Sequence, residues 1–387
     1  MNAQALHTAV PAAGIARQHL IDPEICIRCN TCEEACPSAA ILHDDNNYAV
    51  SFDACNGCGR CLDPCPTGAI RSWREVASAY SIDDQLGWSA LPAQRVDAAP
   101  AAPVAPAAAI PGAPRSSSRP VVNLFKRNAP ARATVVANVA ATEEGAEGEV
   151  RHIVLRMPAG SFPVLEGQSV GIVVPGQDAG GKRHAVRQYS VASARHGESS
   201  DPDALALTVR RVPGGLCSNH LCDLAPGVPV EVTGPFGATF LLPDDPAAHL
   251  LMVCTGTGIA PFRGFIERRR QAMPAATGRA ELFYGARTLP DMPYARALQA
   301  DALAAEFCFS RAPGHPRAYV QDRLRACASR VAALLRDDRT HLYVCGLKGM
   351  EQGVEDALAD ICASAGLDWA ATKAGMRACG RYHVETY

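Results

Sequence analysis

The sequence lacks any apolar segment of the length that a membrane span requires. Its longest apolar stretches, residues 249–254 among them, fall far short of roughly 18 residues. The N-terminus has no basic region followed by an apolar core, so no signal peptide is expected. Basic residues form no clustered stripe of the kind that nucleic-acid-binding proteins carry. These absences predict a soluble, cytoplasmic protein that binds neither membranes nor nucleic acids.

Disulfides are not expected either, although the chain contains 16 cysteines, because the cytosol keeps thiols reduced. Eight of these cysteines lie between Cys26 and Cys65, and the other eight are scattered singly from Cys217 to Cys379. The 387 residues suffice for two or three domains, and with 48% hydrophobic and 20% charged residues they can form hydrophobic cores. A wholly disordered or collagen-like chain is therefore excluded.

The dense cysteines form an internal repeat. The two copies read Cys26-x2-Cys29-x2-Cys32-x3-Cys36-Pro37 and Cys55-x2-Cys58-x2-Cys61-x3-Cys65-Pro66. This spacing is typical of proteins with two [4Fe-4S] clusters, in which the fourth cysteine of each copy ligates the cluster of the other copy. The pattern predicts one cluster on Cys26, Cys29, Cys32 and Cys65 and a second on Cys55, Cys58, Cys61 and Cys36. A zinc site is the alternative, but zinc is usually held by two separated Cys-x2-Cys pairs.

The repeat lies in a small acidic module. Residues 20–75 contain four Arg against nine Asp and Glu, a net charge of −5. A short helix or irregular cover is expected at residues 76–88. Between Ser89 and Pro120, eighteen of 32 residues are Ala or Pro, which indicates a semi-extended linker. We therefore expect a leader at 1–19, an α+β two-cluster domain at 20–75 and an Ala/Pro-rich linker at 76–120.

Two larger domains are expected after the linker. Residues 121–245 contain short β-rich runs separated by Gly and Pro, which predict an antiparallel β-barrel. From residue 246 the order changes to apolar strand, Gly-rich turn, helix and strand. That order predicts a doubly wound α/β domain at 246–387.

Four short motifs in these domains have the composition of nucleotide-binding sites. In Arg187-Gln188-Tyr189-Ser190, the guanidinium can clamp a pyrophosphate and the ring can lie on a flavin. The segment 214–218 precedes a helix whose free N–H groups can bind phosphate. The segment 255–263 follows an apolar strand, as a nucleotide loop does. The fourth motif combines residues 345–350 with residues 384–387. Each motif alone is also compatible with an ordinary strand or turn.

Together and in this order, the motifs resemble those of plant-type ferredoxin-NADP reductases. The match extends over Val121–Tyr387 and includes the strings RQYS, GLCSNHLCDL, TGPFG, GTGTGIAPFRGF, CGLKGME and VETY. The resemblance implies that the barrel binds FAD and that the α/β domain binds NADP. Residues 20–75 in turn resemble two-cluster bacterial ferredoxins.

The resemblance also implies roles for individual residues. It assigns FAD contacts to Arg187, Tyr189 and Ser190, with Leu216, Cys217 and Ser218 at the FAD pyrophosphate. Cofactor contacts are also implied for Gln188, Thr208 and Val209. It places the catalytic set, where nicotinamide meets flavin, at Ser190, Cys345, Glu385 and Tyr387. Tyr387 would stack on the flavin until nicotinamide displaces it. Further contacts to the nucleotide are implied for Arg210, Thr257, Gly346 and Leu347.

The choice of nicotinamide cofactor is expected to depend on residues after the strand 306–309. Ser310 and Arg311 follow this strand directly, and Tyr319 and Arg323 come shortly after. An acidic residue at such a strand end would favour NAD, whereas Arg and Ser suit a 2′-phosphate, so NADPH is predicted. Between Arg211 and Gly214 the chain is shorter than the plant-type enzymes and lacks their loop with an adenine-stacking tyrosine.

Fused in this order, the modules resemble the reductase components of benzoyl-CoA 2,3-epoxidase systems. The resemblance implies an enzyme that passes electrons from NADPH through FAD and two [4Fe-4S] clusters to a separate di-iron oxygenase in aerobic benzoate breakdown. It is compatible with a homodimer. One alternative is a reductase that serves another acceptor or runs toward NADPH formation. A non-enzymatic electron carrier or sensor is the other, and it fits poorly because all the nucleotide motifs are intact.

Overall fold

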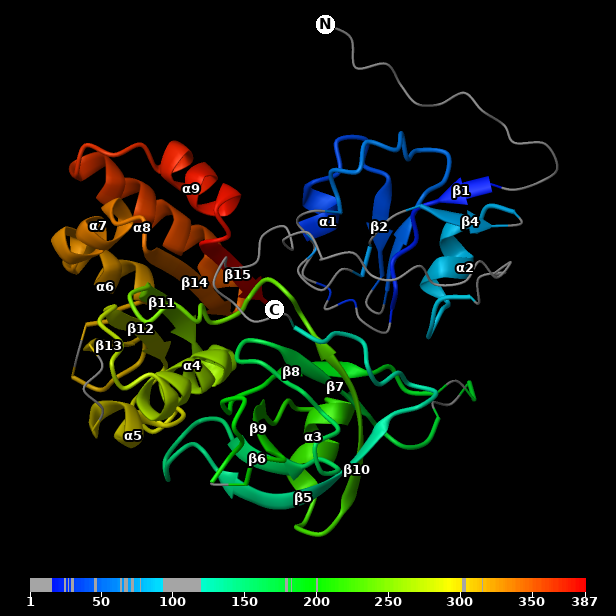
Figure 1. Cartoon of the computed structure of the whole chain (residues 1–387), viewed down its shortest axis with the longest axis horizontal. Helices are drawn as coiled ribbons and strands as arrows, with labels where there is room; N and C mark the ends of the chain where they lie inside the picture. The colour runs from blue at the N-terminus through cyan, green and yellow to red at the C-terminus, as the bar shows by residue number, and fades with distance from the viewer. Residues whose placement is uncertain are drawn as a thin grey trace, which may run out of the picture. The chain divides into compact units, whose positions relative to one another are not determined.

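The computed structural model describes residues 16–23, 26, 28, 31–44, 47–62, 65, 69–70, 73–76, 78–92, 120–177, 180–181, 183–199, 201–300, 304–314 and 316–387. Most of the expected linker, residues 93–119, thus lies outside the described residues. The chain divides into two compact units, one of residues 1–109 with 175–186 and one of residues 110–174 with 187–387. Figure 1 labels the helices and strands of both units.

The first unit contains two small antiparallel sheets. Strand β1 (Ala16–Gln18) pairs with β4 (Arg74–Val76), and β2 (Ile41–His43) pairs with β3 (Tyr48–Val50), while helix α1 (Thr31–Glu34) precedes β2. Residues 16–19 belong to the segment that we expected to be a leader, but they are part of this fold. The reason is that β4 provides a partner strand 58 residues away, as in the pair Arg17 and Glu75 of β1 and β4, which composition does not reveal.

Helix α2 (Ile82–Leu86) covers β3. It begins with a capping box, in which the Ser81 hydroxyl accepts from the Asp84 amide at 3.1 Å and the Asp84 carboxylate accepts from the Ser81 amide. The buried Gln85 side chain then donates to the Val50 carbonyl and accepts from the Val50 amide, both at 2.9 Å. The helix expected in residues 76–88 is present, and it satisfies backbone groups that would otherwise be buried without a partner.

The second unit begins with a six-stranded antiparallel sheet. Its strands are β5 (Ala131–Ala140), β6 (Val150–Arg156), β7 (Ser169–Val173), β8 (Arg187–Ser190), β9 (Ala204–Arg210) and β10 (Pro229–Phe236), in the spatial order β8-β7-β10-β5-β6-β9. A bridge between Val191 and Leu207 joins the end of β8 to β9 and closes the sheet into a barrel. Helix α3 (Leu216–Asp223) adds Cys217 and Leu221 to the barrel core. The predicted antiparallel architecture is confirmed.

The rest of the second unit is a parallel sheet with the order β13-β12-β11-β14-β15. Its strands are β11 (His249–Thr255), β12 (Ala280–Ala286), β13 (Ala304–Phe309), β14 (Thr340–Gly346) and β15 (Tyr382–Thr386). The order reverses between β11 and β14, which are neighbours, as in a doubly wound fold. The prediction of an α/β domain with a parallel sheet is confirmed.

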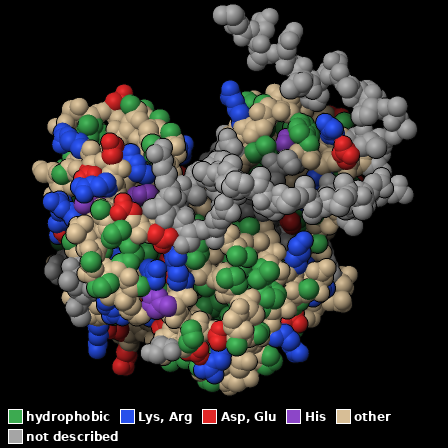
Figure 2. Space-filling model, viewed as in Figure 1, with side chains coloured by type: hydrophobic (Ala, Val, Ile, Leu, Met, Phe, Trp, Pro, Cys, Tyr) green, Lys and Arg blue, Asp and Glu red, His purple; other side chains and the backbone are tan. Residues whose placement is uncertain are grey.

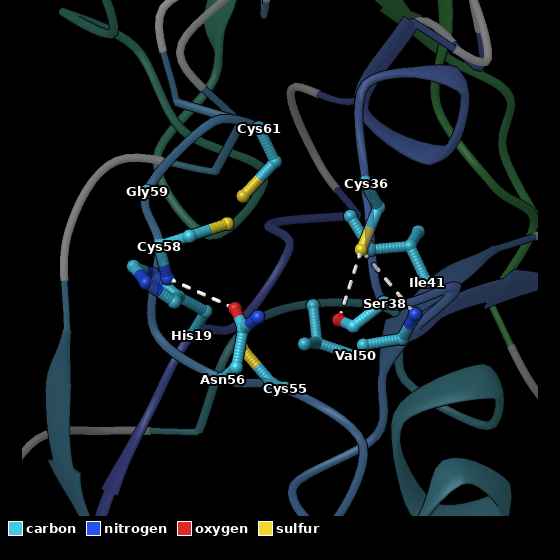
Figure 3. Close-up of a pocket in the computed structure, with 11 residues that line it drawn as sticks. His19, Cys36, Ser38, Ile41, Val50, Cys55, Asn56, Cys58, Gly59 and Cys61 are labelled. Carbon is cyan, nitrogen blue, oxygen red and sulfur yellow. Dashed lines mark hydrogen bonds between the residues drawn. The ribbon is translucent and has the colours of Figure 1, made fainter. Parts of the chain in front are cut away.

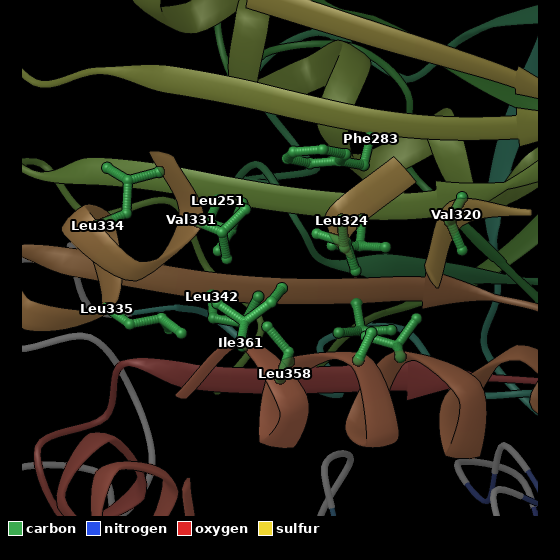
Figure 4. Close-up of a cluster of buried hydrophobic side chains, with 14 of the residues drawn as sticks. Leu251, Phe283, Val320, Leu324, Val331, Leu334, Leu335, Leu342, Leu358 and Ile361 are labelled. Atoms are coloured by element: carbon green, nitrogen blue, oxygen red, sulfur yellow. The ribbon is translucent and has the colours of Figure 1, made fainter. Parts of the chain in front are cut away.

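Two hydrophobic cores cover the two faces of the parallel sheet. Because side chains alternate along a strand, Leu251 and Val253 of β11 face one core and Leu250 and Met252 face the other. The first core, drawn in Figure 4, is completed by α6 (Val320–Ala326), α7 (Ala328–Arg336), α8 (Glu351–Ser364) and α9 (Trp369–Ala378). The second is completed by α4 (Ile259–Ala272) and α5 (Ala295–Ala300). In the described part of the chain, no helix is long and apolar enough to cross a bilayer.

Ion pairs join the barrel to the parallel-sheet domain. Arg263 of α4 donates two hydrogen bonds to Glu198, at 2.7 and 2.8 Å. Burial opposes ionisation of Glu198, but hydrogen bonds from His152 and Arg263 lower the pKa of its carboxyl to about 2. In addition, the Tyr343 hydroxyl donates to the Leu241 carbonyl at 2.6 Å. Figure 2 shows basic and acidic side chains interspersed on the visible face of this unit.

Candidate functional site

Four cysteines of the first unit line one small cavity. They are Cys36 from the first repeat and Cys55, Cys58 and Cys61 from the second. Figure 3 shows their sulfurs directed toward a common space, with Cys36 across from the other three. The chain therefore brings together the same four cysteines that the spacing assigns to the second cluster.

The thiols of this cavity differ in their surroundings. Cys36 Sγ accepts a hydrogen bond from the Ala40 amide at 3.3 Å and lies 3.6 Å from the Ser38 hydroxyl. Although burial opposes ionisation, these hydrogen bonds lower the pKa of the Cys36 thiol. Burial raises the pKa of the Cys61 thiol to about 11. Because an iron-sulfur cluster binds thiolates, its irons would have to displace the proton of Cys61, whereas the lowered pKa of Cys36 favours the thiolate.

The donor set of this cavity suits a cluster better than a single ion. Within the described residues, no group of three or more His, Cys, Asp or Glu side chains converges closely enough to hold one metal ion. The four thiols instead stand around a cavity, and soft thiolates are the usual ligands of iron-sulfur clusters. The residues of the cavity therefore fit a [4Fe-4S] cluster.

The other cysteine quartet is described only in part. Cys32 is buried, Cys26 and Cys65 are half-buried, and Cys29 lies outside the described residues. The Cys65 amide donates to the Leu62 carbonyl at 3.3 Å. A cluster on this quartet stays a prediction.

In the barrel, the four residues from Arg187 to Ser190 form the edge strand β8. Arg187 Nη1 is buried, and none of the described residues accepts a hydrogen bond from it. A guanidinium in this condition suits a bound phosphate. Gln188 Oε1 pairs with the Ser169 hydroxyl at 3.0 Å. Tyr189 forms a hydrogen bond with the buried Cys217 thiol, and burial raises the pKa of the tyrosine.

The start of helix α3 offers free backbone donors. Its N-cap is Gly215, which has no side chain to cap the first turn. A Cβ at Gly215 would lie 2.6 Å from Ser218 Oγ, so glycine is required for this close turn. Leu216 is exposed, and the Ser218 hydroxyl accepts from the Val212 amide at 3.2 Å. Among the described residues no side chain caps this turn, so its amides can bind the phosphate that the sequence predicts here.

The three expected nucleotide contacts on β9 occupy different environments. The Thr208 hydroxyl lies 2.7 Å from the Tyr294 hydroxyl, and Val209 is fully buried in the barrel core. Arg210 is exposed at the end of the strand. Of the three, Arg210 alone is exposed to solvent, so its contact with a nucleotide stays a prediction.

The C-terminal edge of the parallel sheet brings several predicted residues together. Cys345 on β14 pairs in register with Glu385 on β15. Tyr387 continues beyond β15, and its amide donates to the Gly346 carbonyl at 2.9 Å while Lys348 donates to its carbonyl at 3.0 Å. The Tyr387 hydroxyl lies 2.6 Å from the Thr257 hydroxyl of the Gly-rich turn.

This edge is tightly packed against the Gly-rich turn. A Cβ at Gly258 would lie 2.2 Å from the Cys345 carbonyl oxygen, so only glycine allows the turn to approach β14. Burial raises the pKa of the Cys345 thiol well above its usual value. Loss of hydration raises the pKa of the Glu385 carboxyl to about 8. The edge thus offers a neutral thiol and a carboxyl that can hold a proton at neutral pH, beside the exposed side chain of Leu347.

Ser190, the fourth predicted catalytic residue, lies on β8 of the barrel. It is half-buried, and its strand position faces Ser169 of β7. Among the described contacts, no hydrogen bond links its hydroxyl to Cys345, Glu385 or Tyr387. The structure therefore groups three of the four predicted catalytic residues.

The two arginines predicted at the 2′-phosphate are paired with carboxylates. Arg311 donates to Glu147 at 2.8 Å, and Arg323 donates to Glu306 at 2.8 Å through Nε. Ser310 Oγ is 3.5 Å from the Ala286 carbonyl, and Tyr319 is exposed.

Sequence reasoning missed three residues near these sites. Arg317 lies over the Tyr319 ring at 6.0 Å, and no ion pair engages it in the described part of the chain. Its position two residues before Tyr319 could have signalled this. Glu147 approaches Arg311 from the barrel, and His19 lines the cysteine cavity. No sequence signal marks either of these two, because both contacts join distant segments.

Comparisons with known proteins agree with this division of the chain. The family model described as an oxidoreductase FAD-binding domain matches residues 142–240, and the oxidoreductase NAD-binding domain matches residues 252–356. The 4Fe-4S dicluster domain matches residues 19–72. These matches support FAD, a nicotinamide nucleotide and iron-sulfur clusters as cofactors.

Several curated relatives are ferredoxin-NADP reductases. The protein of Thermosynechococcus vestitus is 38% identical over 289 residues, which cover 69% of this chain and 75% of the relative. The chloroplastic protein of Spinacia oleracea is 36% identical over 287 residues, covering 69% of this chain and 78% of the relative. The solved ferredoxin-NADP+ reductase from Plasmodium falciparum has a TM-score of 0.56 at 22% identity, covers 69% of this chain and 99% of its own, and supports the fold alone.

The predicted enzyme class is confirmed by these relatives. The chain belongs to the ferredoxin-NADP reductase family of FAD- and NAD(P)H-dependent oxidoreductases, and it carries an iron-sulfur domain ahead of the reductase.

Proposed function

We propose that the protein oxidises NADPH and passes the electrons through FAD and two [4Fe-4S] clusters to the di-iron oxygenase of a benzoyl-CoA 2,3-epoxidase system. The observation that carries the reductase part is the meeting of Cys345, Glu385 and Tyr387 with Thr257 at one sheet edge. The fusion order and its resemblance to such reductase components support the oxygenase partner. The proposed domains are 20–75 for the clusters, 76–120 as linker, 121–245 for FAD and 246–387 for NADP, except that β1 before the first boundary and α2 after the second pack with the cluster domain.

The residues of the barrel would hold FAD. Arg187 Nη1, buried without an acceptor among the described residues, and the free amides before Ser218 are suited to its pyrophosphate. Tyr189, fixed by Cys217, would flank the ring system.

The residues of the parallel-sheet edge would orient nicotinamide. Glu385, with its raised pKa, can donate or accept a hydrogen bond at a carboxamide, and the buried Cys345 thiol can pack against the reacting face. Tyr387 would yield its place to the nicotinamide ring. Bound flavin takes up two electrons together and releases them one at a time, which clusters can accept.

The 2′-phosphate of NADPH would bind beside Tyr319. Ser310, Arg311 and Arg317 are the residues that favour this assignment. Arg311 donates to Glu147 through Nη1 alone. Arg323, which was also predicted to contact the cofactor, donates to Glu306 through both Nε and Nη2, so we assign it a supporting role.

A second candidate is a reductase that delivers electrons to another acceptor or runs toward NADPH formation. The curated relatives favour this candidate, because both of those described above are named ferredoxin-NADP reductase. Benzoyl-CoA would bind the partner, since no motif in this sequence indicates a CoA-binding site.

The test is NADPH oxidation by the flavin- and cluster-loaded protein with the candidate di-iron epoxidase, with and without benzoyl-CoA, under oxygen. We expect NADPH consumption and product formation to require all three components. Reduction of flavin and clusters without any transfer to the epoxidase would contradict the partner and favour the second candidate. NADH in place of NADPH is the control for the cofactor.

A further inference from the structure

His19 is a buried side chain that lines the cysteine cavity and has no hydrogen-bond partner among the described residues. It is 1% exposed, and none of the described residues accepts from or donates to either of its ring nitrogens. It shares the cavity wall with Cys36, Cys55, Cys58 and Cys61. Figure 3 shows the ring beside Asn56 and Cys58. A buried polar group that stays unpaired is unusual and indicates a missing partner.

The position of the His19 ring is fixed by its neighbours. It stacks on Trp73 with ring centroids 3.9 Å apart and an interplanar angle of 28°. Trp73 immediately precedes β4, and Gln18, the residue before His19, pairs with Arg74 of that strand. The Gln18 amide is in turn bonded to the carbonyls of Val50 and Tyr80. The ring therefore has little freedom to turn away from the cavity toward a different partner.

An imidazole carries at least one N–H in either tautomer. The side-chain carbonyl oxygen of Asn56, which Figure 3 shows beside the ring, accepts from the Cys58 amide at 3.2 Å and forms no hydrogen bond with His19. The other side-chain polar atoms that line the cavity are the sulfurs of the four cysteines and the Ser38 hydroxyl, which lies 3.6 Å from Cys36 Sγ. With a cluster present, its thiolate and sulfide sulfurs are the acceptors that such an N–H can reach.

We propose that His19 donates an N–H···S hydrogen bond to the cluster held by Cys36, Cys55, Cys58 and Cys61 and thereby raises its reduction potential. This inference rests on the proposed function, because it requires that the cavity holds a [4Fe-4S] cluster. The reduced cluster carries one more negative charge than the oxidised cluster, so a donor stabilises the reduced form more. Hydrogen bonds to sulfur are among the factors that set these potentials. His19 is thus a tuning residue, not a ligand.

The first experiment is a redox titration of the full-length, cluster-loaded protein followed by EPR. His19→Phe keeps an aromatic ring for Trp73 and removes the N–H. We expect the ratio of reduced to oxidised cluster at a fixed solution potential to fall roughly tenfold, which equals about 59 mV for one electron. The matched control is His43→Phe, which removes a histidine of the same unit that pairs with Glu33 and does not line the cavity. It should leave the potential unchanged.

A second measurement uses the unaltered sequence. Protein labelled with 15N-histidine is reduced and studied by pulsed EPR, and we expect a 15N coupling to the cluster spin. His43→Phe should retain this coupling. If His19→Phe takes up no cluster, the labelled protein alone decides.

Two outcomes overturn the role of His19 while leaving the proposed function intact. They are a normal cluster signal without 15N coupling in the labelled protein, and a His19→Phe variant with the original potential. If the unaltered protein shows no iron-sulfur signal after reconstitution, the proposed electron path through this cavity fails, and the role of His19 fails with it.

Discussion

Glu147 Oε2 lies 2.8 Å from Arg311 Nη1 and 2.9 Å from Arg287 Nη1. Glu147 belongs to the barrel, in the loop between β5 and β6, whereas both arginines belong to the parallel-sheet domain. One carboxylate thus neutralises two cations at the place proposed for the 2′-phosphate. An incoming phosphate would have to compete with Glu147 for Arg311.

Glu147→Gln should therefore tighten NADPH binding. The ion pair is about half exposed, so its loss should lower the KM for NADPH roughly two- to fivefold, with kcat unchanged. The KM for NADH should not change, because NADH lacks the phosphate. Steady-state kinetics with both cofactors measures this. Glu143→Gln, which breaks the neighbouring pair with Arg296, is the matched control. An unaltered ratio of the two KM values would count against this competition.

Arg317 and Arg323 should respond differently to substitution. Arg317→Ala should raise the KM for NADPH about tenfold and leave that for NADH unchanged, because a charge-assisted bond to phosphate is lost. Arg323→Ala should leave the ratio of the two KM values unchanged and lower the free energy of unfolding by up to ~1 kcal/mol, since it loses its pair with Glu306. Kinetics with both cofactors and urea unfolding separate these effects. A larger cofactor effect from Arg323→Ala would reverse the assignment.

The bond between Thr257 and Tyr387 should restrain the aromatic ring that nicotinamide displaces. Tyr387→Phe removes the hydroxyl that lies 2.6 Å from Thr257 but keeps the ring. We expect the KM for NADPH to fall roughly two- to fivefold, as the loss of one partly exposed hydrogen bond implies. Adding Thr257→Ala to Tyr387→Phe should cause no further decrease. An unchanged KM in the single variant would argue that this bond does not oppose cofactor entry.

Glu385 should make stability depend on pH. Its carboxyl has a pKa of about 8 in the folded protein against 4.5 in the unfolded chain, so the folded state retains a proton between these values. Stability is therefore highest below about pH 4.5 as far as this group is concerned, and it falls as the pH rises toward 8. Glu385→Gln should reduce this pH-dependent decrease in the free energy of unfolding by about 1–2 kcal/mol.

Urea unfolding of the flavin-loaded protein near pH 5 and near pH 8 measures this effect. The variant should gain stability relative to the unaltered protein only at the higher pH. Glu144→Gln, which changes an exposed carboxylate of the same unit, should show no such difference. Equal gains at both pH values would show that Glu385 does not retain a proton.

Much of the fold could be predicted because its signals are local. Short β-rich runs separated by Gly and Pro indicate the strands of the barrel, and the apolar run 249–254 indicates β11. The spacing assigns Cys36, Cys55, Cys58 and Cys61 to one cluster, and these four cysteines line one cavity; that they hold a cluster stays a prediction.

What could not be predicted depends on contacts between distant segments. His19 reaches the cavity because β1 pairs with β4, and no sequence pattern near residue 19 predicts that pairing. Glu147 meets Arg311 only through the packing of the barrel on the parallel-sheet domain. The position of Arg323 after β13 predicts a contact with the cofactor, but the Arg323 guanidinium donates hydrogen bonds to Glu306.

The pairing of β1 with β4 also bears on how such a gene fusion can arise. Residues 16–18 and 74–76 run side by side in opposite directions, so the two ends of the cysteine-bearing segment meet at one place. A segment whose two ends lie close together can be joined to another protein by a single linker without disruption of its own fold. The iron-sulfur part therefore has the geometry of a transferable cassette, which recombination could attach to a reductase while its cysteine framework stays unchanged.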